Sequence, residues 1–344
     1  MSCKHLFIGI GGSGIRTVAK VKYDLVKAGQ SLEEYDFIFI DTCEFEIQEI
    51  NKILDGIIDL SEVILFRQSY DATSPRAAFK RKKQLFKYML EGSINRLFSI
   101  VDLRMSYTLY LNYWIVAGSC GSMGSGIAKD VIETINSIHE EGSYIDITAF
   151  TCLISYMPGK YIERIPKLAH YYTDKAKAFF NELIQVREDG KYDSPGLMVA
   201  IDSRDSAGND LETIDAMCER TAELLSIMLR SRVAESLWSL RDIYYCSVLG
   251  LECGPECQLA VIGFTYDRES AENVFFPLTE EGRERNVVRT VFCLGPPEEV
   301  DKIMEDNTLH DGKWAYLPEW SIDRLTYVSV RMCQSVKDYA LIEL

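Results

Sequence analysis

The 344-residue sequence contains no run of 18 or more apolar residues, so no segment is expected to cross a bilayer as a helix. Basic residues are in the minority: 37 Lys and Arg stand against 52 Asp and Glu, which gives a net charge of −15. Nucleic acids and anionic membranes require a basic surface, so we expect direct binding to neither. The four histidines are far apart in the sequence, and their surroundings suggest no Ser/His/Asp arrangement.

Closely paired cysteines are also lacking. Ten cysteines are scattered along the chain, several of them inside apolar segments. Cys246, Cys253 and Cys257 come closest to a cluster, but their spacing matches no C-x-x-C zinc pattern and no His lies near them. This usage predicts reduced thiols in a cytoplasmic protein, and we assign no residue as a metal ligand. The first apolar run enters a glycine loop instead of a cleavage site, which predicts a first strand and not a signal peptide.

The composition, 47% hydrophobic and 26% charged, is typical of a globular protein with a sizeable core. Short apolar runs that predict strands lie at residues 4–10, 36–40, 63–66, 113–117, 145–155, 196–201, 257–264, 287–294 and 325–332. Segments with helical spacing of apolar residues lie between the early ones, at 15–26, 77–103, 127–141 and 164–187. Strands separated by helices predict an α/β fold with a doubly wound parallel sheet.

The stretch GSCGSMGSG, residues 118–126, lies between a predicted strand and a predicted helix. Its four glycines allow backbone N–H groups to approach a ligand, and the following helix adds its positive N-terminal end. Its three serines offer further hydrogen bonds. A tight turn alone would need only one or two glycines. We therefore favour a loop that cradles phosphates, with a purely structural loop as the alternative.

A second glycine loop, GIGGSG at residues 9–14, follows the first predicted strand and opens a helix. It fits G-x-G-x-x-G, with Asp41 at the end of the next strand, and so also suggests a dinucleotide enzyme. Asp41 lies 27 residues after Gly14, a longer interval than the usual ~20. Neither loop is followed by the G-K-[ST] of a Walker A sequence. Two such loops in one sheet favour a polyphosphate held between both.

The two loops, with a strand ending IDT at residues 40–42, resemble the tubulin/FtsZ superfamily. Its signature loop reads roughly GGTGSG; Gly121, Gly124, Ser125 and Gly126 match it, whereas Ser122 and Met123 replace a Gly and the Thr. The order of elements over roughly residues 1–240 is similar to a divergent bacterial tubulin-like branch. The resemblance implies a nucleotide-binding domain at 1–208, a core helix with its following loop at 209–243, and a smaller C-terminal α/β domain at 244–344. The helix-forming stretch 211–240 lies inside the second of these ranges.

The resemblance also implies GTP or GDP with Mg²⁺ as the ligand, held by residues of the two glycine loops and of five further segments. The glycine-loop residues are Gly11, Gly12, Ser13, Gly14, Gly118, Ser119, Gly121, Ser122, Met123, Gly124, Ser125 and Gly126. The others are Asp41 and Thr42 after the second strand, Thr73 in a loop that senses the γ-phosphate, Glu163 at the ribose, and Asp202 and Asp215 at the base.

The segment after the core helix departs from the family. Polymerising relatives carry an acidic loop there, roughly N-x-D-x-x-D, which enters the next subunit's nucleotide site and positions the attacking water. This chain reads AESLWSLRDIYY at 234–245, where Glu235 and Asp242 are the available catalytic carboxylates. One acid could serve in a shifted loop, hydrolysis could be slow, or the protein could bind nucleotide without cleaving it.

Three functions are therefore considered. The resemblance implies a cytoplasmic, GTP-binding cytoskeletal protein that assembles head-to-tail into filaments, with GTP hydrolysis coupled to assembly. A nucleotide-bound scaffold that does not hydrolyse is the first alternative, and a Rossmann oxidoreductase using NAD(P) is the second. The only basic run, residues 80–83, is interpreted as a solvated helix face, with a contact to a filament neighbour as the alternative.

Overall fold

The structure is a computed structural model. It describes residues 3–66, 74–98, 109–140, 144, 146–156, 166–183, 197–201, 213–230, 258–265, 288–295, 313–316 and 326–333. The chain divides into two compact units, the first formed by 1–156 with 174–196 and the second by 157–173 with 197–344. The domain boundaries predicted at residues 208 and 243 lie outside the described residues.

The first unit is built on a five-stranded parallel sheet in the order β3-β2-β1-β4-β5. Its strands are β1 (Cys3–Ile10), β2 (Tyr35–Asp41), β3 (Val63–Leu65), β4 (Leu109–Gly118) and β5 (Ile147–Tyr156). β2 and β4 are buried along nearly their whole length and β1 along its last five residues, so these strands are mainly apolar and lack the polar alternation of a half-exposed strand. The predicted α/β class with a parallel sheet is confirmed.

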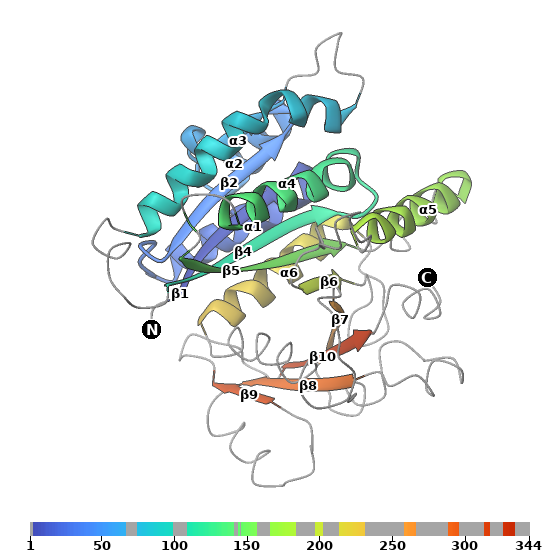
Figure 1. Cartoon of the computed structure of the whole chain (residues 1–344). Helices are drawn as coiled ribbons and strands as arrows, with labels where there is room; N and C mark the ends of the chain where they lie inside the picture. The colour runs from blue at the N-terminus through green and yellow to red at the C-terminus, as the bar shows by residue number, and fades with distance from the viewer. Residues whose placement is uncertain are drawn as a thin grey trace, which may run out of the picture. The chain divides into compact units, whose positions relative to one another are not determined.

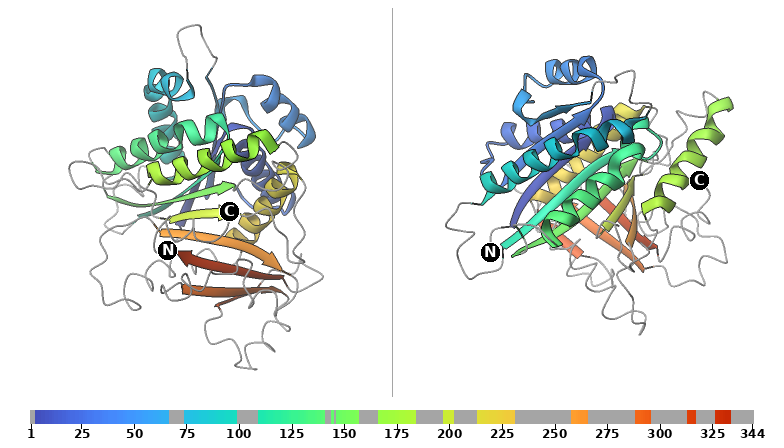
Figure 2. Two further views of the ribbon diagram at one scale, coloured as in Figure 1. Left: turned by 90° about the vertical axis from the view of Figure 1, so that its right-hand side faces the viewer. Right: turned by 45° about the horizontal axis from the view of Figure 1, so that its top comes forward.

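Helices cover both faces of this sheet. They are α1 (Gly11–Lys27), α2 (Glu44–Ile53), α3 (Pro75–Leu97) and α4 (Ser122–Glu140). The chain steps from β1 to β2 to β3 in one direction, then returns across β1 to β4 and β5 in the other. Since such crossovers are right-handed, α1 and α2 lie on one face and α3 and α4 on the other. Figures 1 and 2 show this arrangement, with α2 and α3 on opposite sides of the sheet.

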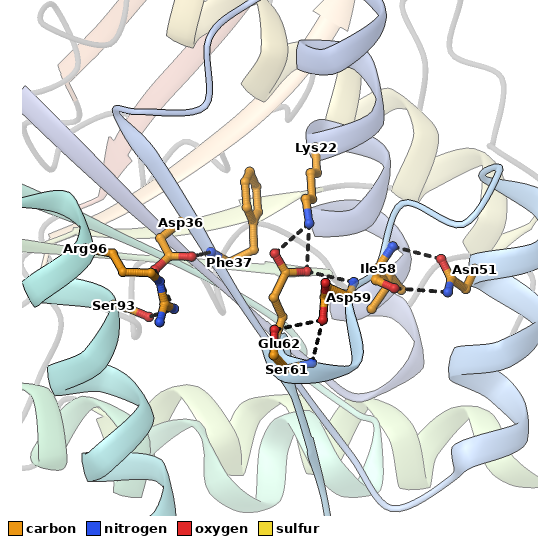
Figure 3. Close-up of polar contacts among 10 residues, drawn as sticks. All are labelled: Lys22, Asp36, Phe37, Asn51, Ile58, Asp59, Ser61, Glu62, Ser93 and Arg96. Atoms are coloured by element: carbon orange, nitrogen blue, oxygen red, sulfur yellow. Dashed lines mark hydrogen bonds and ion pairs between the residues drawn. The ribbon is translucent and has the colours of Figure 1, made fainter.

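Two ion pairs connect the helices to the β2–β3 side of the sheet (Figure 3). Lys22 on α1 donates to both carboxylate oxygens of Glu62, at 2.6 and 2.7 Å, in the short helix η1 (Leu60–Glu62). On the other face, Arg96 of α3 contacts Asp36 of β2 at 2.8 Å. Both faces of the sheet edge are thus fixed by a charged contact as well as by apolar packing.

The histidines of the first unit have structural roles. The Nδ1 atom of His5 accepts a hydrogen bond from Trp114 Nε1 at 3.1 Å, and the His5 ring stacks on Tyr35. Burial lowers the pKa of His5 to about 4, so this ring is neutral and remains an acceptor. His139 lies within 2.7 Å of the Tyr113 hydroxyl, and burial lowers its pKa as well. Neither histidine is placed for nucleophilic catalysis.

The second unit contains a mixed sheet in the order β6-β7-β10-β8-β9, in which β10 runs antiparallel to both of its neighbours. Its strands are β6 (Leu197–Ile201), β7 (Gln258–Thr265), β8 (Val288–Gly295), β9 (Lys313–Tyr316) and β10 (Thr326–Cys333). Helix α6 is described from Ile214 to Arg230, and the remainder of the predicted 30-residue helix lies outside the described residues.

Three elements were not predicted from the sequence: helix α2, the short helix η1 and strand β9. α5 (Pro166–Leu183) agrees with its prediction. No helix in the described part of the chain is both long and apolar enough to span a membrane. The five cysteines among the described residues, Cys3, Cys43, Cys120, Cys152 and Cys218, form no disulfide with one another, which agrees with the predicted reduced state.

Candidate functional site: a crevice between two glycine loops

The two glycine loops lie side by side because β1 and β4 are neighbours in parallel register, with Ile10 opposite Ala117. We call residues 9–14 the first loop and residues 118–126 the second loop. The first loop leads into α1 on one face of the sheet, whereas the second leads into α4 on the other face. Parallel α/β sheets bind ligands at such a switch point, in the crevice beyond the carboxyl ends of the strands. The topology therefore places both predicted loops at the sheet's natural binding position.

Glycine is required in these loops by contacts between backbones. A Cβ atom on Gly14 would lie 2.2 Å from the carbonyl oxygen of Val116, and one on Gly124 would lie 2.6 Å from that of Gly118. Gly11 has a φ of +70°, in the left-handed region that favours glycine. These glycines let β1, β4 and the two helices approach closely, so they are explained without a ligand.

Gly121 differs from these glycines. A Cβ atom there would meet only the carbonyl oxygen of Gly118, at 4.0 Å, so no packing contact of the described fold requires glycine at this position. Gly121 is exposed and directly precedes α4. A ligand that comes close to the backbone would explain the absence of a side chain.

The N-terminal ends of both helices are free of acidic side chains in their first turns. At α1, the N-cap residue Ile10 makes no side-chain capping bond. The first N–H groups of a helix have no partner within it and attract anions. Two such ends at one crevice make a site suited to a polyanion.

Two serine side chains of the second loop donate to backbone carbonyl groups of the protein itself. Ser119 is fully buried and donates to the carbonyl oxygen of Tyr156 at 2.5 Å. Ser125 donates to the carbonyl oxygen of Gly121 at 2.6 Å. Met123 is 5% exposed, and its Cβ would lie 3.1 Å from a Cβ on Gly11, so it packs between the loops. The loop thus presents mainly backbone to the crevice.

Two carboxylates lie beside the first loop. Asp41, at the end of β2, is 3% exposed; its Oδ1 accepts from the Thr42 N–H at 2.6 Å, whereas its buried Oδ2 has no hydrogen-bond partner. Glu46 of α2 lies against Gly12: a Cβ atom added to Gly12 would be 1.8 Å from Oε1 of Glu46. Burial raises the pKa of Asp41, and burial together with the negative charge of Asp41 raises the pKa of Glu46. A bound cation would offset both the burial of these two carboxylates and the repulsion between them.

The first turn of α3 packs against Gly126, the last residue of the second loop. A Cβ on Gly126 would lie 3.3 Å from the Cβ of Pro75. The next residue, Arg76, contacts Asp130 of α4 at 2.9 Å and Glu182 of α5 at 2.7 Å. The first turn of α3 is therefore held against both the loop and the helix that follows it.

Solved structures match this architecture over nearly the whole chain. CetZ2 of Haloferax volcanii, a GTPγS-bound protofilament, has a TM-score of 0.59 at 14% identity, over 99% of this chain and 96% of that one. CetZ of Methanosaeta thermophila has a TM-score of 0.61 at 12% identity, over 98% and 89%. TubZ of Bacillus thuringiensis serovar israelensis, a GTPγS-form protofilament, has a TM-score of 0.52 at 14% identity, over 99% and 89%. The chain has the tubulin/FtsZ fold. No protein-family model and no curated protein matches the sequence.

Within this tubulin/FtsZ fold, the predicted nucleotide-binding residues of both loops follow the carboxyl ends of the neighbouring strands β1 and β4, and Asp41 and Thr42 lie at the end of β2, next to β1. Asp215 belongs to the second unit, in the first turn of α6. The other predicted residues, Thr73, Glu163, Asp202, Glu235 and Asp242, lie outside the described residues. Sequence reasoning did not find Glu46. The signal that could have identified Glu46 is the pair of acidic residues two and four positions after IDT, because acids favour the first turn of a helix.

Proposed function

We propose that the chain binds a guanine nucleotide at the crevice between the two loops and assembles head-to-tail with further copies of itself. The observation that carries the proposal is Gly121, which leaves room at the N-terminal end of α4 that the fold itself does not need. The similar structures described as GTPγS-bound or GTPγS-form protofilaments support both the nucleotide and the assembly. Another similar structure, CetZ1 of Haloferax volcanii, is a GDP-bound monomer.

The backbone N–H groups at the starts of α1 and α4 would bind the phosphates, since this geometry needs no basic side chain. Asp41 and Glu46 fit Mg²⁺, because Asp41 Oδ2 is a buried oxygen without a partner and Glu46 lies beside it. Mg²⁺ is commonly held by one or two carboxylates together with substrate phosphates. When bound, it would offset the repulsion between these acids and the nucleotide.

Slow or absent hydrolysis is the second candidate, and Met123 favours it. The family signature has a threonine hydroxyl at this position, whereas Met123 fills the space between the loops with an apolar side chain. Under this alternative the protein is a nucleotide-bound scaffold. Phosphate release measured during assembly distinguishes the two: assembly without release of phosphate identifies the scaffold.

The first test is the replacement of Gly121 by valine. We expect guanine-nucleotide affinity to fall at least tenfold, because the new side chain would occupy the space of the ligand, while the free energy of unfolding changes by less than about 1 kcal/mol. Isothermal titration with GTP, GDP, ATP and NAD, followed by urea unfolding, measures both quantities. Wild-type protein that binds NAD and ignores GTP would overturn the proposal, as would a Gly121→Val variant with unchanged GTP affinity.

The second test concerns the cation. Chelating Mg²⁺ is expected to weaken nucleotide binding by the wild type at least tenfold, because the Glu46 carboxylate then repels the phosphates. In Glu46→Gln the same chelation should weaken binding only about threefold. Glu44→Gln, an exposed residue at the start of the same helix, is the control and should behave as the wild type. Equal Mg²⁺ dependence of the Glu46 and Glu44 variants would contradict a role for Glu46.

A further inference from the structure

Tyr156, the last residue of β5, is hydrogen-bonded toward both glycine loops. Its hydroxyl group forms a hydrogen bond with Thr17 Oγ1 on α1, the helix that begins in the first loop. Its carbonyl oxygen accepts the hydrogen bond from Ser119 Oγ of the second loop, at 2.5 Å. Tyr156 is 1% exposed, and Thr17 and Ser119 are fully buried, so water does not compete for either bond. One buried residue of β5 is therefore connected to both sides of the candidate site.

The direction of the bond between Tyr156 and Thr17 follows from the single proton of the threonine hydroxyl. Thr17 Oγ1 donates to the carbonyl oxygen of Ser13 in the first loop, at 3.0 Å, and a carbonyl oxygen can only accept. The Tyr156 hydroxyl therefore donates to Thr17. The bond from Thr17 to Ser13 is a common one between residues four apart in a helix. The bond from Tyr156 joins residues 139 positions apart, so it connects the first loop to a distant strand.

Packing between the two loops limits how close they come. A Cβ on Gly118 would lie 3.0 Å from Ser13 Oγ, and a Cβ on Gly11 would lie 3.1 Å from the Cβ of Met123. Such contacts prevent closer approach, but each resists separation only weakly, because a single dispersion contact is small. The starts of α1 and α4 are both positive helix ends, which repel each other when no anion lies between them. Hydrogen bonds to a shared residue oppose that separation.

We propose that Tyr156 is a positioning residue of the candidate site, which holds the two glycine loops at the separation that a chain of phosphates spans. The inference rests on the proposed binding of a nucleotide between the loops. Tyr156 acts through Thr17 and Ser119, and it needs no contact with the ligand. A ligand with one phosphate can bind at a single helix start, so its affinity should not depend on the separation of the loops.

Replacement of Tyr156 by phenylalanine tests this role, because it removes the donor hydroxyl and keeps the packing of the ring. We expect the affinities for GTP and for inorganic pyrophosphate to fall about fivefold, the usual effect of one hydrogen bond. The affinities for GMP and for orthophosphate should stay within about twofold of the wild type, because neither ligand spans both loops. Isothermal titration in the presence of Mg²⁺ measures all four. A purely structural role would lower all four affinities in proportion.

Tyr113→Phe is the matched control. Tyr113 is a fully buried tyrosine on the neighbouring strand β4, and its hydroxyl is bonded at 2.7 Å to His139 in the last turn of α4, away from the loops. Its replacement should lower the urea midpoint about as much as Tyr156→Phe does, while the ratio of GTP to GMP affinity stays that of the wild type.

Variants at Thr17 test the same connection from its other end, and they decide the question if Tyr156→Phe does not fold. Thr17→Ser keeps the hydroxyl and should retain the affinity for GTP, whereas Thr17→Val should lower it about fivefold. Adding Tyr156→Phe to Thr17→Val should cause no further loss, because both replacements remove one interaction.

Equal losses of GTP and GMP affinity in Tyr156→Phe would overturn the proposal, as would a ratio of the two affinities equal to that of Tyr113→Phe. A wild type that ignores GTP would overturn the proposed nucleotide, and the titrations with pyrophosphate and orthophosphate would then decide the role of Tyr156 alone. A wild type that binds neither GTP nor pyrophosphate would overturn both.

Discussion

Replacement of Gly14 by alanine is expected to lower the free energy of unfolding by about 3 kcal/mol or more. The new methyl group would lie 2.2 Å from the carbonyl oxygen of Val116, which belongs to the central strand β4 and cannot turn away as a flexible side chain could. Relief would require α1 to move away from the sheet, and the first loop would move with it. Urea unfolding measures the loss, and GTP titration should show weaker binding in the fraction that remains folded.

Gly92→Ala is the matched control, because Gly92 is also a helical glycine. A Cβ there would meet only the Nη1 atom of Arg96, at 3.6 Å. The replacement should therefore raise the free energy of unfolding by about 0.5–1 kcal/mol, the usual gain of alanine over glycine in a helix. If Gly14→Ala and Gly92→Ala changed stability equally, the close packing of α1 on β4 would be wrong.

Replacement of Glu62 by alanine is expected to cost about 3 kcal/mol. The side chains of Lys22 and Glu62 are only 9% and 14% exposed, so removing the carboxylate leaves a buried ammonium group without its partner (Figure 3). Burial raises the pKa of Glu62 even though Lys22 opposes this shift, which indicates that desolvation is the dominant effect. A double replacement, Lys22→Met with Glu62→Leu, should therefore recover most of the lost stability.

The comparison for this pair is Lys20 with Asp24, an ion pair on the outer part of α1 whose side chains are 31% and 21% exposed. Asp24→Ala should cost less than about 1 kcal/mol, as partly exposed pairs do. Thermal unfolding of the wild type and the three variants ranks their stabilities. A Glu62→Ala variant as stable as Asp24→Ala would show that the Lys22–Glu62 pair is accessible to water.

The sequence predicted the parallel sheet and the place of both glycine loops, because these depend on local requirements. Buried parallel strands must be continuously apolar, and close backbone contacts must have glycine. Helix α2 was missed because only Ile47 and Ile50 are buried, whereas Phe45 and Ile53 face outward and obscure the helical pattern. Strand β9 has four residues, which is too short to produce a recognisable period.

The details of the candidate site could not be predicted, because they depend on contacts between distant segments. Ser119 was expected to offer its hydroxyl to phosphate, but its donor is used by the carbonyl oxygen of Tyr156, 37 residues away. Met123 occupies the position of the signature threonine, and only its contact with Gly11 shows that its side chain fills the space between the two loops. The position of Glu46 against Gly12 depends on helix α2, which was not predicted from the sequence. Sequence spacing carries no information on any of these contacts.

The contact between Pro75 and Gly126 gives the first turn of α3 a mechanical connection to the crevice. A ligand that displaced the second loop would therefore press on the first turn of α3, where Arg76 contacts Asp130. Coupling between two sites is reciprocal, so a partner on α3 whose binding responded to the nucleotide would alter nucleotide affinity by the same factor. Binding at the glycine loops and binding on α3 would then be two linked equilibria.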